Sequence, residues 1–264
     1  MTCWASVDEH AKLWLKEAGK KIIASFQTAL EINTKADAND LVTNIDQQIE
    51  QYFTKEIRLT FPSHKILGEE GFGDELVNTD GVIWIIDPID GTMNFVHQQR
   101  NFFISIGILD NGIGKLGYLY DVVHDELYYA EAGKGAYWDE LKLPKLEEVP
   151  VENALIGCSA TWMAPNRYMD PTNTLIPLAQ DVRGTRSYGS AALEFAYVAT
   201  GRLDAYISMR LSPWDFAGGK IIVEELGGIV TDLNGEKLSI LQKSSILVAK
   251  PGLHAKILEN YLKK

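Results

Sequence analysis

The sequence predicts a mixed α/β chain in which helices and sheets form layers, with an α+β arrangement in its first half. Three observations lead to this prediction. The N-terminal segment repeats apolar residues at helical spacing, the middle alternates strand-like runs with tight turns, and the second half alternates strands with helices. This order of elements is typical of sheets covered by helices.

Two helices are expected first. Apolar residues recur at helical spacing near the N-terminus, at Val7, Ala11, Trp14 or Leu15, Ala18, Ile22 and Phe26. A second helix is expected from about Leu41 to Leu59, because apolar residues follow one another there at four-residue steps. Thr43 followed by Asp46 resembles an N-cap at the start of a helix.

Strands are expected next. A short strand over 65–67 runs into Gly68, and the continuous apolar run over 82–86 is typical of a buried strand. An antiparallel meander is expected to follow, with strands over 103–109, 116–120 and 127–130 and turns at Asn111-Gly112 and Gly133.

The second half is expected to alternate. Strands are predicted over 155–158, 204–208, 228–231 and 246–249, and helices over 173–179, 190–200, 214–226 and 254–262. The charged segment 140–149 contains proline and lacks periodicity. We therefore expect one domain over 1–264, with an α+β part over about 1–145 and an α/β part over about 146–264.

Composition limits the kinds of binding partner and the cellular compartment that we expect for this chain. Lys and Arg total 25 against 36 Asp and Glu, so the net charge is −11, which disfavours nucleic acid and anionic membranes. No apolar run is long enough to span a membrane, and we expect no secretion signal. Cys3 and Cys158 are the only cysteines, which favours a reducing, cytoplasmic location.

The segment from Trp84 to Phe95 carries the most specific chemistry. Asp87 and Asp90 stand three residues apart at the end of a predicted buried strand, where both can reach one hard cation. Mg²⁺ prefers carboxylate and carbonyl oxygens. The amides of Gly91 and Thr92 open a predicted helix and could hold an anion. A metal beside an anion site suits phosphoryl transfer, and a helix-capping turn is the alternative interpretation.

Two further segments carry weaker signals. Asp215 is expected at the N-cap of a helix that contains Gly218 and Gly219, and these glycines predict close packing against another element. Glu69 and Glu70 follow a predicted strand, where they form either a solvated turn or part of a metal site.

Two other patterns are set aside. The G-x-G-x-x-G pattern over 112–117 precedes a strand-like segment, so a hairpin turn is favoured over a dinucleotide site. The segment 87–92 is one residue longer than the D-x-D-G-T motif of aspartyl-phosphate enzymes, which disfavours a phosphoenzyme.

Taken together, these segments resemble the inositol monophosphatases, Mg²⁺-dependent phosphatases of the lithium-sensitive superfamily. The resemblance extends over nearly the whole chain, through Asp40-Leu41-Val42-Thr43 with Asp46, Gly68-Glu69-Glu70, Trp84 to Phe95, Gly189-Ser190-Ala191-Ala192 and Trp214-Asp215 to Gly219. It implies an α-β-α-β-α sandwich of the sugar-phosphatase type, usually assembled as a homodimer.

The resemblance also implies roles for single residues. Two or three Mg²⁺ ions are expected, with Glu69, Asp87 and the carbonyl of Ile89 on the first, Asp87, Asp90 and Asp215 on the second, and a weaker third near Glu69. The catalytic residues are Glu69, Asp46 and Thr92, and Thr92 bonded to Asp46 is expected to orient and help deprotonate the attacking water. The phosphate and the substrate are expected to contact Gly91, Thr92, Gly189, Ser190, Ala191, Ser208 and Arg210, with Glu70 and Lys35 in secondary roles.

The implied reaction is Mg²⁺-dependent hydrolysis of inositol monophosphate, a small phosphorylated metabolite, to inositol and phosphate, with inhibition by lithium. Ser208 stands where many members carry a glutamate that contacts inositol hydroxyls, and Arg210 lies close by. This departure predicts a broadened substrate range. The alternatives are an NADP(H) 2′-phosphatase or a fructose-1,6-bisphosphatase, and, from another class, a non-enzymatic partner of the transcription machinery.

Overall fold

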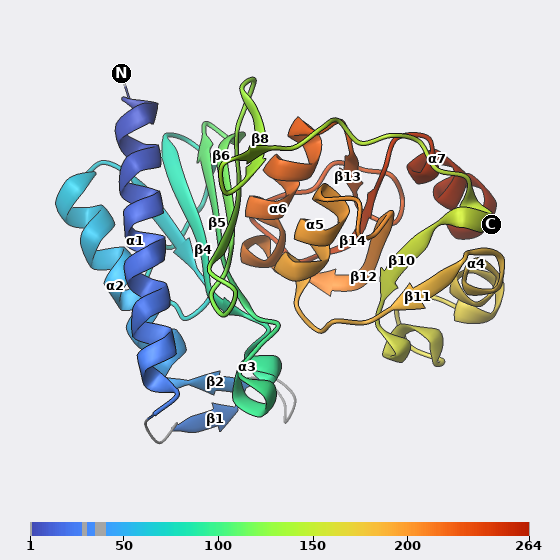
Figure 1. Cartoon of the computed structure of the whole chain (residues 1–264), viewed down its shortest axis with the longest axis horizontal. Helices are drawn as coiled ribbons and strands as arrows, with labels where there is room; N and C mark the ends of the chain where they lie inside the picture. The colour runs from blue at the N-terminus through green and yellow to red at the C-terminus, as the bar shows by residue number, and fades with distance from the viewer. Residues whose placement is uncertain (1, 28–30, 35–40, 264) are drawn as a thin grey trace.

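Two large β-sheets alternate with three layers of helices in the structure, a computed structural model that describes residues 2–27, 31–34 and 41–263 (Figure 1). A seven-stranded sheet has the order β3-β4-β5-β6-β7-β8-β9, and a five-stranded sheet has the order β11-β10-β12-β14-β13. Helices α1 (Trp4–Ser25) and α2 (Asn44–Thr60) cover the outer face of the first sheet. Helices α5 (Ala191–Ala199) and α6 (Pro213–Glu225) lie between the sheets, and α4 (Leu175–Asp181) and α7 (Leu253–Ile257) cover the second. The predicted α-β-α-β-α sandwich is confirmed.

The strands of the first sheet are largely those expected. They are β3 (Lys65–Gly68), β4 (Val82–Asp90), β5 (Phe103–Asp110), β6 (Ile113–Asp121), β7 (Glu126–Glu131), β8 (Gly135–Trp138) and β9 (Leu141–Lys142). β3 pairs parallel with β4, and every later pair is antiparallel. The predicted meander is therefore confirmed, although β8 and β9 were not predicted.

The second sheet mixes parallel and antiparallel pairs. Its strands are β10 (Leu155–Cys158), β11 (Gly184–Arg186), β12 (Ala205–Leu211), β13 (Ile229–Thr231) and β14 (Ser244–Ala249). β10 runs parallel to both β11 and β12, whereas β14 is antiparallel to β12 and β13. β12 extends to Leu211, three residues beyond the predicted strand, and so includes both Ser208 and Arg210. No segment of helix or strand joins β9 to the 3₁₀ turn Val151–Asn153, in the region where the boundary was expected; the division into parts stays a prediction.

Two helix boundaries differ from the prediction. Residues Leu41–Thr43 form strand β2, which pairs antiparallel with β1 (Ile32–Thr34), and the helix begins only at Asn44. The four-residue apolar repeat continued through Leu41, but pairing with β1 sets the backbone there. At the C-terminus, the predicted helix 254–262 is split into α7 and a π-helical turn over Leu258–Leu262.

The close packing predicted for the glycines of α6 is confirmed. A Cβ on Gly218 would lie 2.8 Å from the carbonyl oxygen of Ile106 on β5, and a Cβ on Gly219 would overlap the ring of Phe195 on α5. α6 therefore touches the first sheet on one side and α5 on the other. Its first turn, which carries Asp215, is thereby fixed relative to both neighbours.

The outer face of the first sheet packs through aromatic side chains. Trp14 on α1 lies 5.8 Å from Trp84 on β4, measured between ring centroids, and Phe53 of α2 is fully buried in the same cluster. Within the described residues, we find no helix both long and apolar enough to cross a membrane.

Candidate active site

The C-terminal end of β4 carries the two acidic residues of the central motif. The pairing of β4 with β5 shifts register between Asp87 and Asp90, so a bulge separates the two carboxylates. The backbone N–H of Ile89 donates to Oδ1 of Asp87 at 3.0 Å. Gly91 then adopts a left-handed conformation (φ 95°) and leads into the short helix α3 (Thr92–Gln98).

Asp215 comes from the other half of the chain. It is not the N-cap of α6, as predicted, but the third residue of the first turn, and Ser212 is the N-cap. Asp215 accepts a hydrogen bond from the backbone N–H of Ser212 at 2.8 Å in a capping box. The sequence pattern placed the acid correctly at the helix start but missed Ser212, although Pro213 at the first helical position and Asp215 at the third are local signals that identify Ser212 as the N-cap.

These three carboxylates form one cluster. An oxygen from each of Asp87, Asp90 and Asp215 lies within 4.8 Å of the others. Burial, followed by the charges of Glu69 and Asp90, raises the pKa of Asp87 well above its usual value. Burial also raises the pKa of Asp215 well above its usual value and that of Asp90 to about 6. Buried carboxylates so close together repel one another when ionised, and a bound divalent cation removes that repulsion. The donor set therefore fits Mg²⁺.

Asp90 is held by the start of α5. One of its oxygens accepts hydrogen bonds from the hydroxyl of Ser190 and from the backbone N–H of Ala192 at 2.7 Å. Ser190 is the N-cap of α5, so these donors belong to the electropositive end of that helix.

Thr92 lies between two acceptors. Its hydroxyl is 3.1 Å from the carbonyl oxygen of Ile89 and 3.3 Å from Oδ1 of Asp46. Asp46 is fully buried at the start of α2, where Thr43 and Asp46 form the predicted capping box. Burial raises the pKa of Asp46 to about 6, although hydrogen bonds from Thr43 act against it. The expected contact between Thr92 and Asp46 is present.

Glu69 and Glu70 follow β3. Glu69 lines the same pocket as the three aspartates, whereas the backbone N–H of Glu70 donates to Glu50 at 2.6 Å. Glu50 is a fully buried acid on α2, and its second oxygen accepts from the N–H of Phe72 at 2.8 Å. A Cβ on Gly68 would overlap the carboxylate of Glu50, so glycine is required at the end of β3. Glu50 therefore fixes the turn that presents Glu69.

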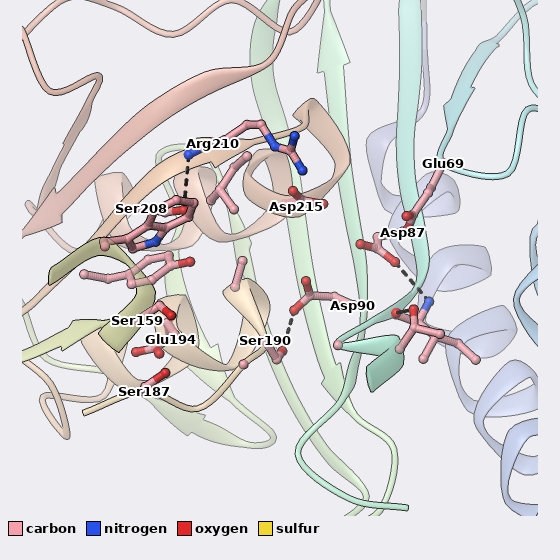
Figure 2. A pocket seen from close by; sticks show the side chains of 18 residues that line it. Glu69, Asp87, Asp90, Ser159, Ser187, Ser190, Glu194, Ser208, Arg210 and Asp215 are labelled. Carbon is pink, nitrogen blue, oxygen red and sulfur yellow. Dashed lines mark hydrogen bonds between the residues drawn. The ribbon is translucent and has the colours of Figure 1, made fainter. Parts of the chain in front are cut away.

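One pocket of about 440 Å³ joins these elements, within the range of small-molecule sites. Figure 2 shows Glu69, Asp87, Asp90 and Asp215 on one side and Ser159, Ser187, Glu194 and Ser208 on the other. The predicted residues that line it are Glu69, Asp87, Ile89, Asp90, Gly91, Thr92, Gly189, Ser190, Ala191, Ser208, Arg210 and Asp215. Asp46 and Glu70 do not line the pocket. Lys35 and Asp40 lie outside the described residues.

Several pocket residues were not predicted. Glu194, in the first turn of α5, is only 3% exposed, and burial raises its pKa to about 7. One of its oxygens accepts from the N–H of Tyr188 at 3.1 Å, and the other has no hydrogen-bond partner among the described residues. Trp162, Tyr206, Ser159 and Ser187 also line the pocket. Tyr206 belongs to the segment Asp204-Ala205-Tyr206, which also matches the family pattern, whereas Trp162, Ser159 and Ser187 lie outside the matching segments and reach the site only through the tertiary fold.

Comparisons with known proteins agree with this geometry. The family model described as "Inositol monophosphatase family" matches residues 4–263. Inositol-1-monophosphatase of Bacillus subtilis (strain 168) is 56% identical over 262 residues, covering 99% of this chain and 98% of that protein.

Solved structures of related phosphatases also superpose closely on this chain. The crystal structure of staphylococcal SaIMPase-II with inositol monophosphate superposes with a TM-score of 0.88 at 39% identity, covering 98% of this chain and 94% of that one. An IMPase/NADP phosphatase complexed with Mg²⁺ and phosphate gives a TM-score of 0.88 at 30% identity, covering 97% and 94%. The carboxylate cluster, the fold and these similarities agree that the chain belongs to the inositol monophosphatase family.

Proposed function

We propose that the protein is a Mg²⁺-dependent phosphomonoesterase that hydrolyses inositol monophosphate to inositol and phosphate. The observation that carries the proposal is the cluster of Asp87, Asp90 and Asp215 at one end of a pocket that also contains Glu69 and the start of α3. The 56% identity to a protein named inositol-1-monophosphatase, and the related structure that holds inositol monophosphate, support the substrate.

The metal assignment extends the cluster. We propose that Glu69, Asp87 and the carbonyl of Ile89 hold one Mg²⁺ and that Asp87, Asp90 and Asp215 hold a second, with a third, weaker ion near Glu69. The related structure with Mg²⁺ and phosphate supports the choice of metal. When bound, Mg²⁺ supplies charge stabilisation for the phosphoryl group and leaving oxygen and makes water a stronger acid.

Thr92 and Asp46 are proposed to orient the attacking water and to help deprotonate it. The Thr92 hydroxyl has one hydrogen and two acceptors, the carbonyl of Ile89 and the carboxylate of Asp46. When the Ile89 carbonyl is engaged as a ligand, Asp46 remains as the acceptor for that hydrogen. The Thr92 oxygen can then accept a hydrogen bond from the attacking water and orient it. Its backbone N–H and that of Gly91 are proposed to contact the phosphate, together with Gly189, Ser190 and Ala191.

The far side of the pocket supports a broadened substrate range. Ser208 and Arg210 both line it. Ser208 stands where many members carry a carboxylate, and the cation of Arg210 lies close by. We therefore keep NADP(H) 2′-phosphatase activity as the second candidate, which the related IMPase/NADP phosphatase supports, and fructose-1,6-bisphosphatase activity beside it. The intact acidic cluster counts against a purely non-enzymatic partner of the transcription machinery.

Three finer properties follow from the same proposal. Lithium is proposed to inhibit by competing at a metal site, as a related structure soaked in LiCl and described as an inhibitory complex suggests. A homodimer is proposed from the family resemblance alone. A cytoplasmic location is consistent with two free cysteines, Cys3 and Cys158.

The direct test is phosphate release from a substrate panel, with and without Mg²⁺. The panel holds inositol 1-phosphate, NADP⁺, fructose 1,6-bisphosphate and 3′-phosphoadenosine 5′-phosphate at equal concentration. We expect Mg²⁺-dependent release, with inositol 1-phosphate among the substrates of highest kcat/KM. Folded protein that releases phosphate from none of them with ample Mg²⁺ contradicts the proposal.

A further inference from the structure

A second cavity lies along α6, apart from the candidate active site. Its volume is about 500 Å³, within the range of small-molecule sites, and it is bounded by the C-terminal half of α6, the β5–β6 hairpin and the β7–β8 turn. A narrower cavity of about 60 Å³ adjoins it, and the two share the lining residues Gly112, Gly114, Lys220, Ile221 and Leu238. We call the two together the α6 cavity. Among the described residues, none lines both the α6 cavity and the active-site pocket.

The β5–β6 hairpin forms one wall of the α6 cavity. Asn111 and Gly112 both have a positive φ, of 51° and 76°, as in a tight hairpin turn. The pairing of β5 with β6 shifts register between Ile108 and Leu109, so the hairpin also contains a bulge. A bulge bends its strand and re-aims the chain beyond it, and bulges are frequent beside functional sites. The G-x-G-x-x-G segment, expected to form a hairpin turn, therefore also shapes the wall of a cavity.

The interior of the α6 cavity is apolar. Ile221 and Val230 are buried in its lining, and Leu238 is partly buried beside them. The narrow inner end adds four further apolar side chains, those of Leu109, Phe216, Ala217 and Ile240. A buried water molecule needs several polar partners, and these side chains offer none. The inner end therefore favours a hydrocarbon group over water.

The acidic side chains that line the wide mouth already have partners. The two carboxylate oxygens of Glu225 accept hydrogen bonds from the backbone N–H groups of Gly133 and Gly135, at 2.9 and 3.0 Å. The carboxylate of Glu224 is paired with Nζ of Lys220 at 2.6 Å. Neither acid therefore needs a cation from a ligand.

The lysines that line the mouth still have donors to offer. Lys237 is exposed and has no ion pair among the residues that the structure describes. Lys220 uses one ammonium hydrogen on Glu224, and an ammonium group has three. In a chain of net charge −11, an ammonium group without an acidic partner is a local site of positive potential. The mouth of the α6 cavity therefore favours an anionic group.

We infer that the α6 cavity binds an amphipathic organic anion, a ring system or short hydrocarbon chain that carries one anionic group. The hydrocarbon part lies against Ile221, Leu238 and the inner end, and the anionic group contacts Lys220 and Lys237. A sugar phosphate does not match this division, because it offers no apolar surface to the inner end. The inference is independent of the proposed function, since the α6 cavity and the active-site pocket have separate linings.

The experiment uses two fluorescent probes that differ in charge. Anilinonaphthalene sulfonate joins aromatic rings to one sulfonate and becomes fluorescent when it leaves water, and phenylnaphthylamine has the same rings without the sulfonate. Each is titrated into the folded full-length protein at low ionic strength, with and without Mg²⁺ and inositol 1-phosphate to occupy the active-site pocket. We expect one molecule of the sulfonate to bind per chain, more tightly than the neutral probe and independently of the active-site ligands.

The variants separate the charged mouth from the apolar interior. In Lys237→Gln, and more strongly in the double variant with Lys220→Gln, we expect the dissociation constant of the sulfonate to rise at least about tenfold, because charge-assisted hydrogen bonds are lost. That of the neutral probe should not change. Ala132→Phe adds a ring at an exposed lining position and should weaken both probes. Lys256→Gln is the matched control, because Lys256 is an ion-paired lysine on α7 outside the lining of the α6 cavity.

Each other outcome decides against the inference. A wild-type protein that binds neither probe overturns it, and so does a double lysine variant that binds the sulfonate as tightly as the wild type. Displacement of the sulfonate by Mg²⁺ and inositol 1-phosphate places the probe in the active-site pocket and also overturns it. Thermal unfolding of each variant confirms that it is folded. A protein that binds the sulfonate as expected but releases no phosphate from any substrate overturns the proposed function alone.

Discussion

The carboxylate of Glu50 accepts a hydrogen bond from the backbone N–H of Glu70 at 2.6 Å, so a buried acid on α2 holds the turn that follows β3. The same helix carries Asp46 one turn earlier, and Asp46 contacts Thr92. One face of α2 therefore supports both the segment that presents Glu69 and the hydroxyl proposed to orient water. Residues that fix metal ligands in this way typically affect metal affinity when they are changed.

The variant Glu50→Gln is expected to weaken Mg²⁺ binding. One of the two oxygens that accept from Glu70 and Phe72 becomes an amide nitrogen, which cannot accept a hydrogen bond. We expect the Mg²⁺ concentration for half-maximal phosphate release to rise about tenfold, with partial rescue at high Mg²⁺. Glu56→Gln is the control, since Glu56 lies on the same helix outside the pocket lining. An unchanged Mg²⁺ dependence in folded Glu50→Gln shows that the turn is held by other contacts.

The variant Asp90→Asn is expected to lose at least about 100-fold in kcat/KM while remaining folded. The amide oxygen of asparagine can still accept from Ser190 and Ala192, so the start of α5 keeps its contact. The charge needed to hold a divalent cation is lost. Phosphate release and thermal unfolding measure the two effects, and Asp80→Asn, at an exposed position before β4, is the control. Wild-type turnover at saturating Mg²⁺ would remove Asp90 from the metal site.

The variant Glu194→Gln is expected to stabilise the metal-free protein increasingly as pH rises. The pKa of Glu194 in the folded protein is raised to about 7 from 4.5, so its contribution to stability is present below about pH 4.5 and is lost as pH rises through about 7. Glutamine stays neutral and keeps the acceptor for Tyr188.

Between about pH 5 and about pH 8, the free energy of unfolding of Glu194→Gln should rise relative to the wild type by about 1–3 kcal/mol. Urea unfolding in EDTA at both pH values measures this difference. The exposed Glu259→Gln is the control and should show no such trend. A difference that is independent of pH contradicts the prediction.

The variant Gly219→Ala is expected to lower the free energy of unfolding by about 1–3 kcal/mol, because its Cβ would overlap the ring of Phe195. The control is Gly184→Ala, where a Cβ would make ordinary contacts at 3.4 Å and beyond. Chemical denaturation compares the two. If both variants are equally stable, α6 and α5 can separate without loss, and the close approach has no energetic role.

The sequence predicted the parts of the site that are local. Asp87, Asp90, Gly91 and Thr92 lie within six consecutive residues. The strand before them was predicted from an apolar run, and the helix after them from its start at Asp90-Gly91-Thr92. Ser212 was missed as the N-cap of α6, and β2 was mistaken for helix. The β2 error arose because pairing with β1 sets the backbone there, whereas the Ser212 error overlooked a local signal, the capping box with Asp215.

Contacts between distant segments could not be predicted from the residues alone. Glu194 and Trp162 reach the pocket from α5 and from the segment after β10, and neither carries a motif. Glu50 fell within the predicted second helix, but its role depends on the turn after β3, which periodicity does not place beside α2. The part that such residues play in the site follows only from the three-dimensional arrangement of the helices and sheets.

Asp215 lies far behind Asp87 and Asp90 in the chain, so it is synthesised later. Asp87 and Asp90 emerge from the ribosome with the first sheet, whereas Asp215 and the α5 donors to Asp90 follow only after β10 and β11. A nascent or truncated chain that ends before α6 therefore lacks the complete three-carboxylate cluster. Because a ligand that binds only the folded state shifts the folding equilibrium toward it, Mg²⁺ bound as proposed would stabilise the folded full-length chain but could not stabilise a chain that lacks Asp215 in the same way.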